Sequence, residues 1–167
     1  YSSPCYRTPA RALPTTRNVV HISVDGAADV TTSAIPEVFF SDAVDPQSAT
    51  SQQIFLLHTA VAVEGGDLPA CGSDWQSQAI TISFPTDEDQ PDHMLRVEAD
   101  GELSAGHCYA LVLTTAVKGS QLGPLENLGL CDQATGNPNA DLCAGLSSAG
   151  AGDPPRVGAF ALFRVTQ

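Results

Sequence analysis

Seven short apolar runs, each about as long as a β-strand, dominate the chain. They are rich in β-branched and aromatic residues, and turn-forming Gly, Pro, Asp and Ser separate them. They cover residues 19–24, 36–41, 53–59, 79–84, 93–99, 108–115 and 157–165. No segment repeats apolar residues at the helical spacing over three turns. This pattern predicts an all-β fold, an Ig-like antiparallel β-sandwich of about seven strands.

Two segments depart from this rhythm. Residues 1–18 contain three prolines and no periodicity, which predicts an extended N-terminal arm. Residues 120–156 are rich in Gly, Ala, Pro and Asn, and a structureless connection of this length is unusual in a compact domain. We therefore expect a single sandwich over residues 19–167, with a long disulfide-closed insertion at 120–156 before its last strand.

The charge balance excludes some classes of partner. The net charge is -12, from 19 acidic and 7 basic residues, whereas binding to a nucleic-acid backbone needs clustered Lys and Arg. No apolar run approaches the ~18 residues of a membrane span. We therefore expect neither nucleic-acid binding nor membrane insertion. Because the chain starts at Tyr1 without an apolar leader, we also expect it to be a mature or trimmed form.

The chain contains five cysteines, which is many for a domain of this size. They form no CxxC pair and no Cys/His cluster at zinc spacing. Disulfides persist in oxidising compartments. The cysteines therefore predict an extracellular or cell-surface location, and the periplasm, which is also oxidising, is the alternative.

Motifs of catalysis are absent from the sequence. It contains no GxSxG, HExxH, phosphate-loop or GxGxxG pattern. His58 and His93 could meet across a sheet, but we expect them to be ordinary surface or half-buried histidines. No pair among the 19 acidic residues is singled out by its spacing. The sequence therefore predicts no catalytic residue and no enzymatic activity.

Two stretches carry oxygen ligands of the kind that calcium prefers. Residues 86–93 hold four acidic side chains, for which a solvated turn is the simpler interpretation. The second stretch lies between two cysteines and contains Asp132, Asn137, Asn139 and Asp141. It lacks the glycine and terminal glutamate of an EF-hand loop, and Asn and Asp also favour turns. Calcium binding there is therefore an alternative to a plain turn.

Two segments resemble bacterial Ig-like domains of the SbsA type. Residues 39–57, "FFSDAVDPQSATSQQIFLL", look like that family's strand, Asp-Pro turn and strand. Residues 99–125, which include "LSAGHCY", look like its turn that leads into a tyrosine-bearing strand. The resemblance covers roughly 19–125 and the last strand, and the insertion and the cysteines depart from it. It implies a non-catalytic extracellular spacer, adhesive module or appendage.

Tyr109 follows a glycine-containing turn, where a tyrosine corner belongs in an Ig-like sandwich. If its ring points inward, the strand's period of two places Cys108 on the outer face. We therefore expect Cys108 to pair with Cys71 on an external loop. Cys131 would then pair with Cys143. Cys5 is left as a free thiol, as a link to another chain, or as a competitor of these four.

The outer face of one sheet is too apolar to stay in water. We expect that face to be covered either by another protomer or domain, or by the insertion, and we favour the insertion with subunit contacts at its rim. The insertion would contribute Leu122, Leu125, Leu128, Leu130 and Leu146. The residues of this expected interface are Phe55, Leu57, Val112, Phe160 and Leu162.

Together these features predict a non-catalytic structural or adhesive module at the cell surface. Its partners would be other protein subunits or neighbouring domains, with self-association through the arm at residues 1–18. The alternative is a calcium- or carbohydrate-binding accessory module of a secreted hydrolase, with Trp75 and Tyr6 as the aromatic candidates for a sugar platform.

Overall fold

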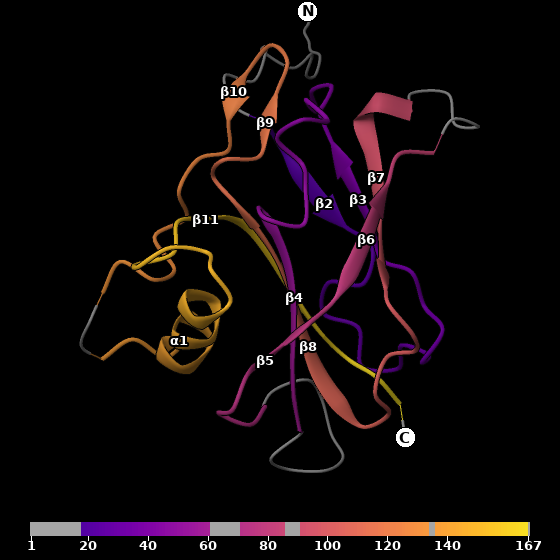
Figure 1. The fold of residues 1–167 in the computed structure, drawn as a ribbon, viewed down its shortest axis with the longest axis vertical. Coiled ribbons are helices and arrows are strands. Elements are labelled where there is room, and N and C mark those ends of the chain that lie inside the picture. The colour runs from indigo at the N-terminus through magenta and orange to yellow at the C-terminus, as the bar shows by residue number, and fades with distance from the viewer. Residues whose placement is uncertain (1–17, 61–70, 86–90, 134–135, 167) are drawn as a thin grey trace, which may run out of the picture.

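The computed structural model describes residues 18–60, 71–85, 91–133 and 136–166, which form two packed antiparallel sheets (Figure 1). One sheet has the order β11-β8-β4-β5 and the other β2-β3-β7-β6. The strands are β2 (Val20–Ile22), β3 (Glu37–Phe40), β4 (Ile54–Ala60), β5 (Gln76–Gln78), β6 (Ile80–Ser83), β7 (Met94–Ala99), β8 (His107–Thr114) and β11 (Val157–Arg164), and the 3-10 helix η1 (Pro91–His93) precedes β7.

The strand order is that of an Ig-like sandwich. The sheet β2-β3-β7-β6 corresponds to strands A, B, E and D, and the sheet β11-β8-β4-β5 to strands G, F, C and C′. The all-β fold class expected from the sequence is therefore confirmed, and each predicted run contains a strand. The short strand β5 was not predicted, because "QSQ" offers no apolar residue to alternate with its polar ones. Tyr1 to Arg17 lie outside the described residues, as does most of the acidic stretch at 86–93.

The main core lies between the sheets and centres on Tyr109. This side chain is fully buried and stacks on Phe163, with ring centroids 5.4 Å apart. Its hydroxyl oxygen accepts a hydrogen bond of 2.7 Å from the backbone N–H of Ser104. This bond closes the turn just before β8, so the tyrosine corner expected from the sequence is confirmed.

The insertion is not structureless. It contains the strand β10 (Gly123–Pro124), which forms a two-stranded hairpin with β9 (Lys118–Gly119) just before the insertion, and the helix α1 (Ala140–Ser148). After the C-cap residue Ala149 the chain turns at Gly150, whose φ is +98°, with hydrogen bonds from Ala151 N–H to Leu146 C=O and from Gly150 N–H to Ser147 C=O. These are the two bonds of a Schellman cap. The helix is only nine residues long, which is too short for a periodicity test to detect.

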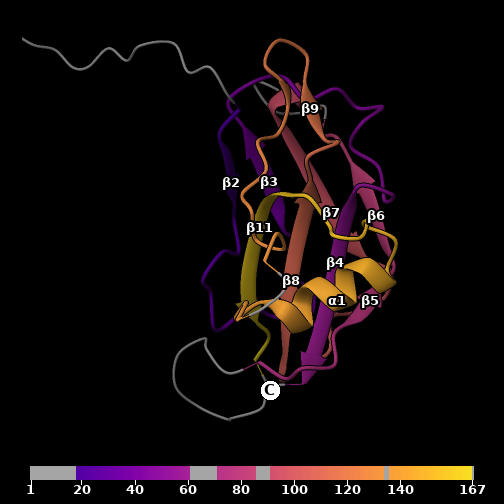
Figure 2. The same cartoon turned by 90° about the vertical axis from the view of Figure 1, so that its left-hand side faces the viewer.

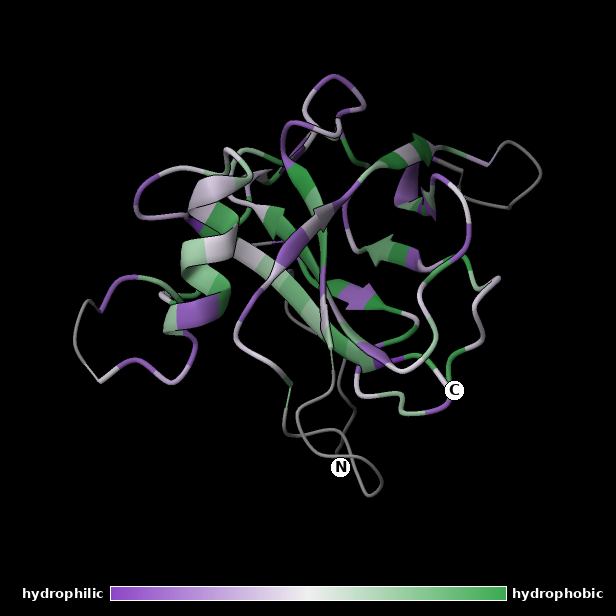
Figure 3. Ribbon diagram, turned by 60° about the horizontal axis from the view of Figure 1, so that its bottom comes forward, coloured by the Kyte–Doolittle hydropathy of each residue, from purple (hydrophilic) through white to green (hydrophobic). Residues whose placement is uncertain are grey.

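The helix lies across the outer face of the β11-β8-β4-β5 sheet (Figure 2). Figure 3 shows hydrophobic and hydrophilic residues on α1, beside strands that are mainly hydrophobic. A second apolar cluster fills the space between helix and sheet. Its buried members are Phe55, Leu57, Ala110, Val112, Cys131, Leu142, Cys143, Leu146 and Val157. The C–F–G sheet is therefore packed on both faces, which explains why the middle parts of β4, β8 and β11 are apolar at both parities.

Candidate functional site

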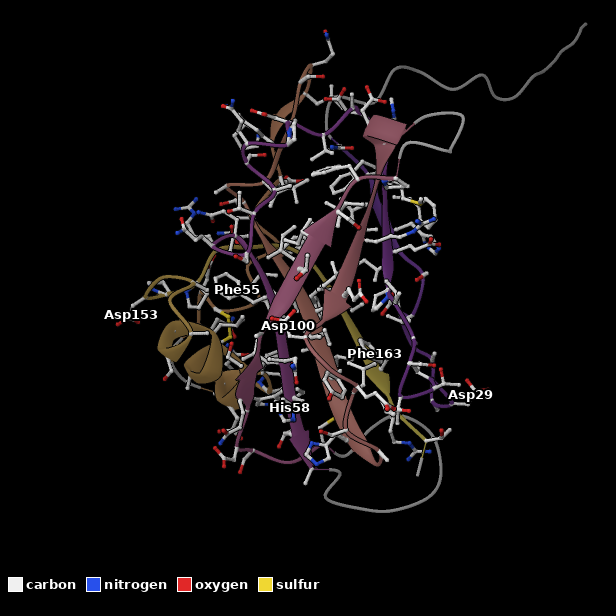
Figure 4. The ribbon with its side chains drawn as sticks, turned by 45° about the vertical axis from the view of Figure 1, so that its right-hand side comes forward. Asp29, Phe55, His58, Asp100, Asp153 and Phe163 are labelled. Atoms are coloured by element: carbon white, nitrogen blue, oxygen red, sulfur yellow. A yellow bond between two sulfur atoms is a disulfide. The ribbon has the colours of Figure 1, made fainter. Side chains whose placement is uncertain are left out.

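The apolar residues expected to form an interface are covered by the chain's own insertion. Phe55, Leu57 and Val112 are at most 7% exposed and pack under α1. Figure 4 shows Phe55 on the side of the sheet that α1 covers. Phe160 and Leu162 pack against the same cluster but remain half-buried at its rim. The favoured expectation, that the insertion is the main cover of this face, is therefore confirmed, and Phe55, Leu57 and Val112 belong to the protein's own second core.

The insertion covers the face with fewer of the expected leucines. Leu130 and Leu146 belong to the second core, whereas Leu125 packs into the main core between the sheets. Leu128 is exposed and Leu122 only half-buried. Leu142 of α1 contributes instead, as do the two cysteines of the ring. Which leucines face the sheet depends on where α1 starts, and the sequence did not reveal that helix.

Gly145 allows α1 to approach the sheet closely. A Cβ atom at this position would lie 2.8 Å from Trp75 Cβ and 3.1 Å from Leu57 Cδ2. In an exposed helix, Gly→Ala stabilises by about 1 kcal/mol. Here we expect Gly145→Ala to lower the free energy of unfolding by about 1–2 kcal/mol, because the helix must move away from the sheet.

Denaturant unfolding with a matched variant tests this expectation. Ala144 is the exposed neighbour of Gly145 in the same helix. Ala144→Gly should follow helix propensity and destabilise by about 1 kcal/mol. If Gly145→Ala instead stabilised the protein, α1 would not be packed against Trp75.

Both expected disulfides are present. Cys71 is bonded to Cys108 with Cα atoms 5.8 Å apart, and Cys131 to Cys143 with Cα atoms 5.6 Å apart. Cys108 is buried, on the opposite face of β8 from the core residue Tyr109. The first bond therefore attaches an external segment to β8, and the second ties α1 to the chain before it. Cys5 lies outside the described residues.

The oxygen ligands between Cys131 and Cys143 serve local structure. The Asn137 side chain donates a hydrogen bond of 2.9 Å to Leu130 C=O, and its oxygen accepts one of 2.9 Å from Asn139 N–H. Asp132 lies within 3.5 Å of the Asn127 amide nitrogen, and Asp141 is in the first turn of α1. The described residues contain no group of three or more His, Cys, Asp or Glu side chains placed to hold a metal ion. The contacts therefore fit the turn interpretation of this loop.

The histidines form one close pair, but it is not the pair considered from the sequence. His58 of β4 meets His107 of β8, with the two Nδ1 atoms 3.0 Å apart. His93 instead contacts the neighbouring Asp92 at 3.1 Å. Burial lowers the pKa of His58, and the nearby His107 lowers this pKa further, so the environment favours the neutral form of the ring. The register of β4 on β8, which pairs Ala60 with His107, brings the two rings together.

Asp42 is a buried carboxylate at the end of β3. Its Oδ2 accepts hydrogen bonds from the backbone N–H groups of Leu122, at 2.7 Å, and Gln121, at 2.9 Å. Burial alone would raise its pKa, but the hydrogen bonds from Leu122, Gln121 and Ala43 and the nearby His93 outweigh burial and hold the pKa below its usual value. Gly119 leaves room for this contact, because a Cβ there would collide with the carboxylate. Asp42 thus attaches the β9–β10 hairpin to the sandwich.

A groove of about 350 Å³ runs between β2 and β11, the edge strands of the two sheets. Ser41 N–H bonds to Val19 C=O, so Val20 turns its N–H and C=O away from β3. The backbone N–H of Arg164 bonds to Ala27 C=O, on the side of β11 that faces away from β8. Phe160 has the same parity as Arg164, so its N–H and C=O also point away from β8. Among the described residues, the outward backbone groups of Val20 and Phe160 have no hydrogen-bond partner. The groove therefore presents unpaired backbone groups of one residue on each of two strand edges.

The rim of this groove combines apolar and acidic side chains. Val19 and Leu128 are 54% and 55% exposed, which is unusual for large apolar residues that line a groove. Asp25 and Glu126 line the same groove. Sequence reasoning did not find this site, because it depends on which strands become edges of the two sheets.

Comparison with known proteins returned no protein-family model and no curated protein that matches the chain. In the described part of the chain, no helix is long and apolar enough to cross a membrane.

Proposed function

We propose that the chain is a non-catalytic extracellular module, akin to bacterial Ig-like domains of the SbsA type, with a structural or adhesive role in a surface assembly. The observation that carries this proposal is the groove between β2 and β11, where both sheets present unpaired backbone beside an apolar rim. Free strand edges are the places where an extended segment of another chain adds to a sheet. The two disulfides support a location in an oxidising compartment.

The segment that fits this groove is the N-terminal arm of a second copy. Residues 1–17 contain three of the seven basic residues, Arg7, Arg11 and Arg17, and no acidic residue. The rest of the chain therefore holds four basic residues against all 19 acidic ones. The opposite charges of the arm and of the rest of the chain favour contact between the arm and the acidic groove. It also offsets the repulsion between two copies of a strongly acidic body.

The arm is also long enough to reach a neighbour. Seventeen extended residues span up to about 55–60 Å, against a radius of gyration of about 15 Å for a domain of this size. Pro4 and Pro14 share a parity and Pro9 has the other, so a short segment between two prolines would pair with the edge, and not the whole arm. Pairing of an arm with β11 would satisfy the backbone of Phe160.

Among the described residues, the two groups whose pKa departs from the usual value do not form a catalytic pair. Asp42 lies beside the β9–β10 hairpin and is occupied by backbone hydrogen bonds. His58 lies towards the opposite end of the sandwich (Figures 1 and 4). General acid–base chemistry needs its groups within reach of one bound substrate. Their separation supports a non-catalytic role.

Sedimentation velocity across a range of protein concentrations tests the proposed assembly. We expect the full chain to self-associate as its concentration rises. Leu128→Lys places a cation in the groove against the arginines of the arm, and deletion of residues 1–17 removes the arm. Each change should weaken association at least tenfold, which corresponds to about 1.4 kcal/mol.

Ile35→Lys is the matched control, because Ile35 is similarly exposed, at 44%, but does not line the groove. It should associate like the unchanged chain. A full chain that stays monomeric at all concentrations would contradict the proposal. So would a Leu128→Lys variant that associates as strongly as Ile35→Lys.

A further inference from the structure

The backbone register of β4 on β8 places the rings of His58 and His107 next to each other. His58 lies opposite Tyr109 in the β4–β8 register, and His107 lies opposite Ala60. Residues 107 and 109 share a parity, so both imidazoles project from the core-facing side of the sheet. Seven consecutive paired positions fix the two strands relative to each other. The two rings are therefore held together by backbone register.

An aromatic stack restricts the orientation of His58. Its ring stacks on Tyr109 with centroids 5.3 Å apart and an angle of 20° between the ring planes. Tyr109 in turn stacks on Phe163, deep in the main core. The His107 ring also contacts His58, with centroids 5.1 Å apart and an angle of 33° between the ring planes. The pair is thus pre-organised at the end of a rigid stack.

The separation of the two Nδ1 atoms matches that of two ligands on one metal ion. Imidazole nitrogens bind divalent metals at about 2.0–2.1 Å. Two such nitrogens 3.0 Å apart would subtend an angle of about 90–100° at a shared ion at those bond lengths. This is the angle between adjacent ligands in a tetragonal site, which Cu²⁺ and Ni²⁺ prefer. A tetrahedral ion such as Zn²⁺ prefers a wider angle.

We infer that His58 and His107 form a two-histidine site for a divalent transition-metal ion, with Cu²⁺ bound most tightly and Ni²⁺ less tightly. Cu²⁺ stands at the top of the affinity order for nitrogen ligands. The described residues supply no third His, Cys, Asp or Glu ligand, so water completes the coordination. Both histidines are half-buried, and the neighbouring Ala60 is exposed, so an ion can reach the pair from solvent.

Metal binding would replace the hydrogen atom that bridges the two Nδ1 atoms with the metal ion. In the hydrogen bond between the rings, one Nδ1 carries the proton and the other accepts it. When the ion binds, the donor ring transfers this proton to its own Nε2, so that each Nδ1 has a lone pair available for the metal. In that ring the Nδ1–H bond is broken and an Nε2–H bond is formed, so a pair of neutral rings releases no net proton.

Electron paramagnetic resonance with Cu²⁺ tests the site. The full chain with Cys5→Ser, which removes the unassigned thiol, should bind one equivalent of Cu²⁺ with a spectrum of two coordinated nitrogens. Saturating Cu²⁺ should raise the melting temperature by several degrees, because the ion binds the folded state. Zn²⁺ at the same concentration should raise it less.

Variants of each histidine separate this site from other copper-binding groups. His58→Asn and His107→Asn should each abolish the two-nitrogen spectrum and the thermal shift. His21→Asn and His93→Asn, at histidines outside the pair, should keep both. Persistence of spectrum and shift in His58→Asn would overturn the inference, and so would a full chain that takes up no Cu²⁺ with two nitrogens. Neither result bears on self-association through the groove.

Discussion

Phe55→Asp is expected to lower the free energy of unfolding of the isolated domain by at least about 4 kcal/mol. Phe55 is 7% exposed and lies between the C–F–G sheet and α1. Truncation of a buried phenylalanine alone costs about 3–5 kcal/mol, and an unpaired carboxylate in an apolar cluster adds a desolvation cost. Urea unfolding followed by far-UV circular dichroism measures the change.

Phe39→Asp is the control for this variant. Phe39 is 38% exposed and lies on β3, in the other sheet. The same chemical change there should cost less than about 1 kcal/mol, because the carboxylate stays hydrated. If Phe55→Asp were as harmless as Phe39→Asp, the insertion would not cover the outer face of the sheet.

Asp42→Ala is expected to lower the free energy of unfolding by about 2–3 kcal/mol. The substitution leaves the N–H groups of Leu122 and Gln121 without their acceptor, and hydrogen bonds to a charged group contribute about 1.5–3 kcal/mol. We also expect amide exchange in the β9–β10 hairpin to accelerate. Asp29→Ala, at an exposed carboxylate (Figure 4), should change stability by less than about 0.5 kcal/mol.

The contribution of Asp42 should depend on pH in a defined direction. Folding lowers the pKa of this carboxyl, so its stabilising effect is fully present above the unfolded pKa of about 4. It is lost as the pH falls below that value and through the folded pKa. The difference in the free energy of unfolding between the unchanged chain and Asp42→Ala should therefore be constant from about pH 5 to about pH 7 and shrink below about pH 4. A difference that grew on acidification would contradict this assignment.

The strands could be predicted from the sequence because each is a local signal. Apolar runs such as those of β4 and β8 lie between turn residues, and the inward position of Tyr109 fixed the parity of its strand. That parity was enough to place Cys108 on the outer face and to pair it with Cys71. It also showed that the outer face of the sheet needed a cover.

The remaining features depend on tertiary structure. α1 has only nine residues, and Gly145 lowers its intrinsic helix propensity, so the sequence favoured a loop. The pairing of His58 with His107 depends on the β4–β8 register rather than on spacing along the chain. The groove exists because β2 and β11 are edge strands, and no pattern within one segment records which strands become edges.

Amide hydrogen exchange at Phe160, followed as a function of protein concentration, tests the proposed assembly most directly. Its N–H points away from β8 into the groove. If the arm of a second copy pairs there, exchange at Phe160 should slow at least tenfold from dilute to concentrated protein, a change of about 1.4 kcal/mol. Exchange in β5, the edge strand on the opposite side of the same sheet, should not change. Exchange at Phe160 that is the same at every concentration, whether fast or slow, would contradict assembly through this groove.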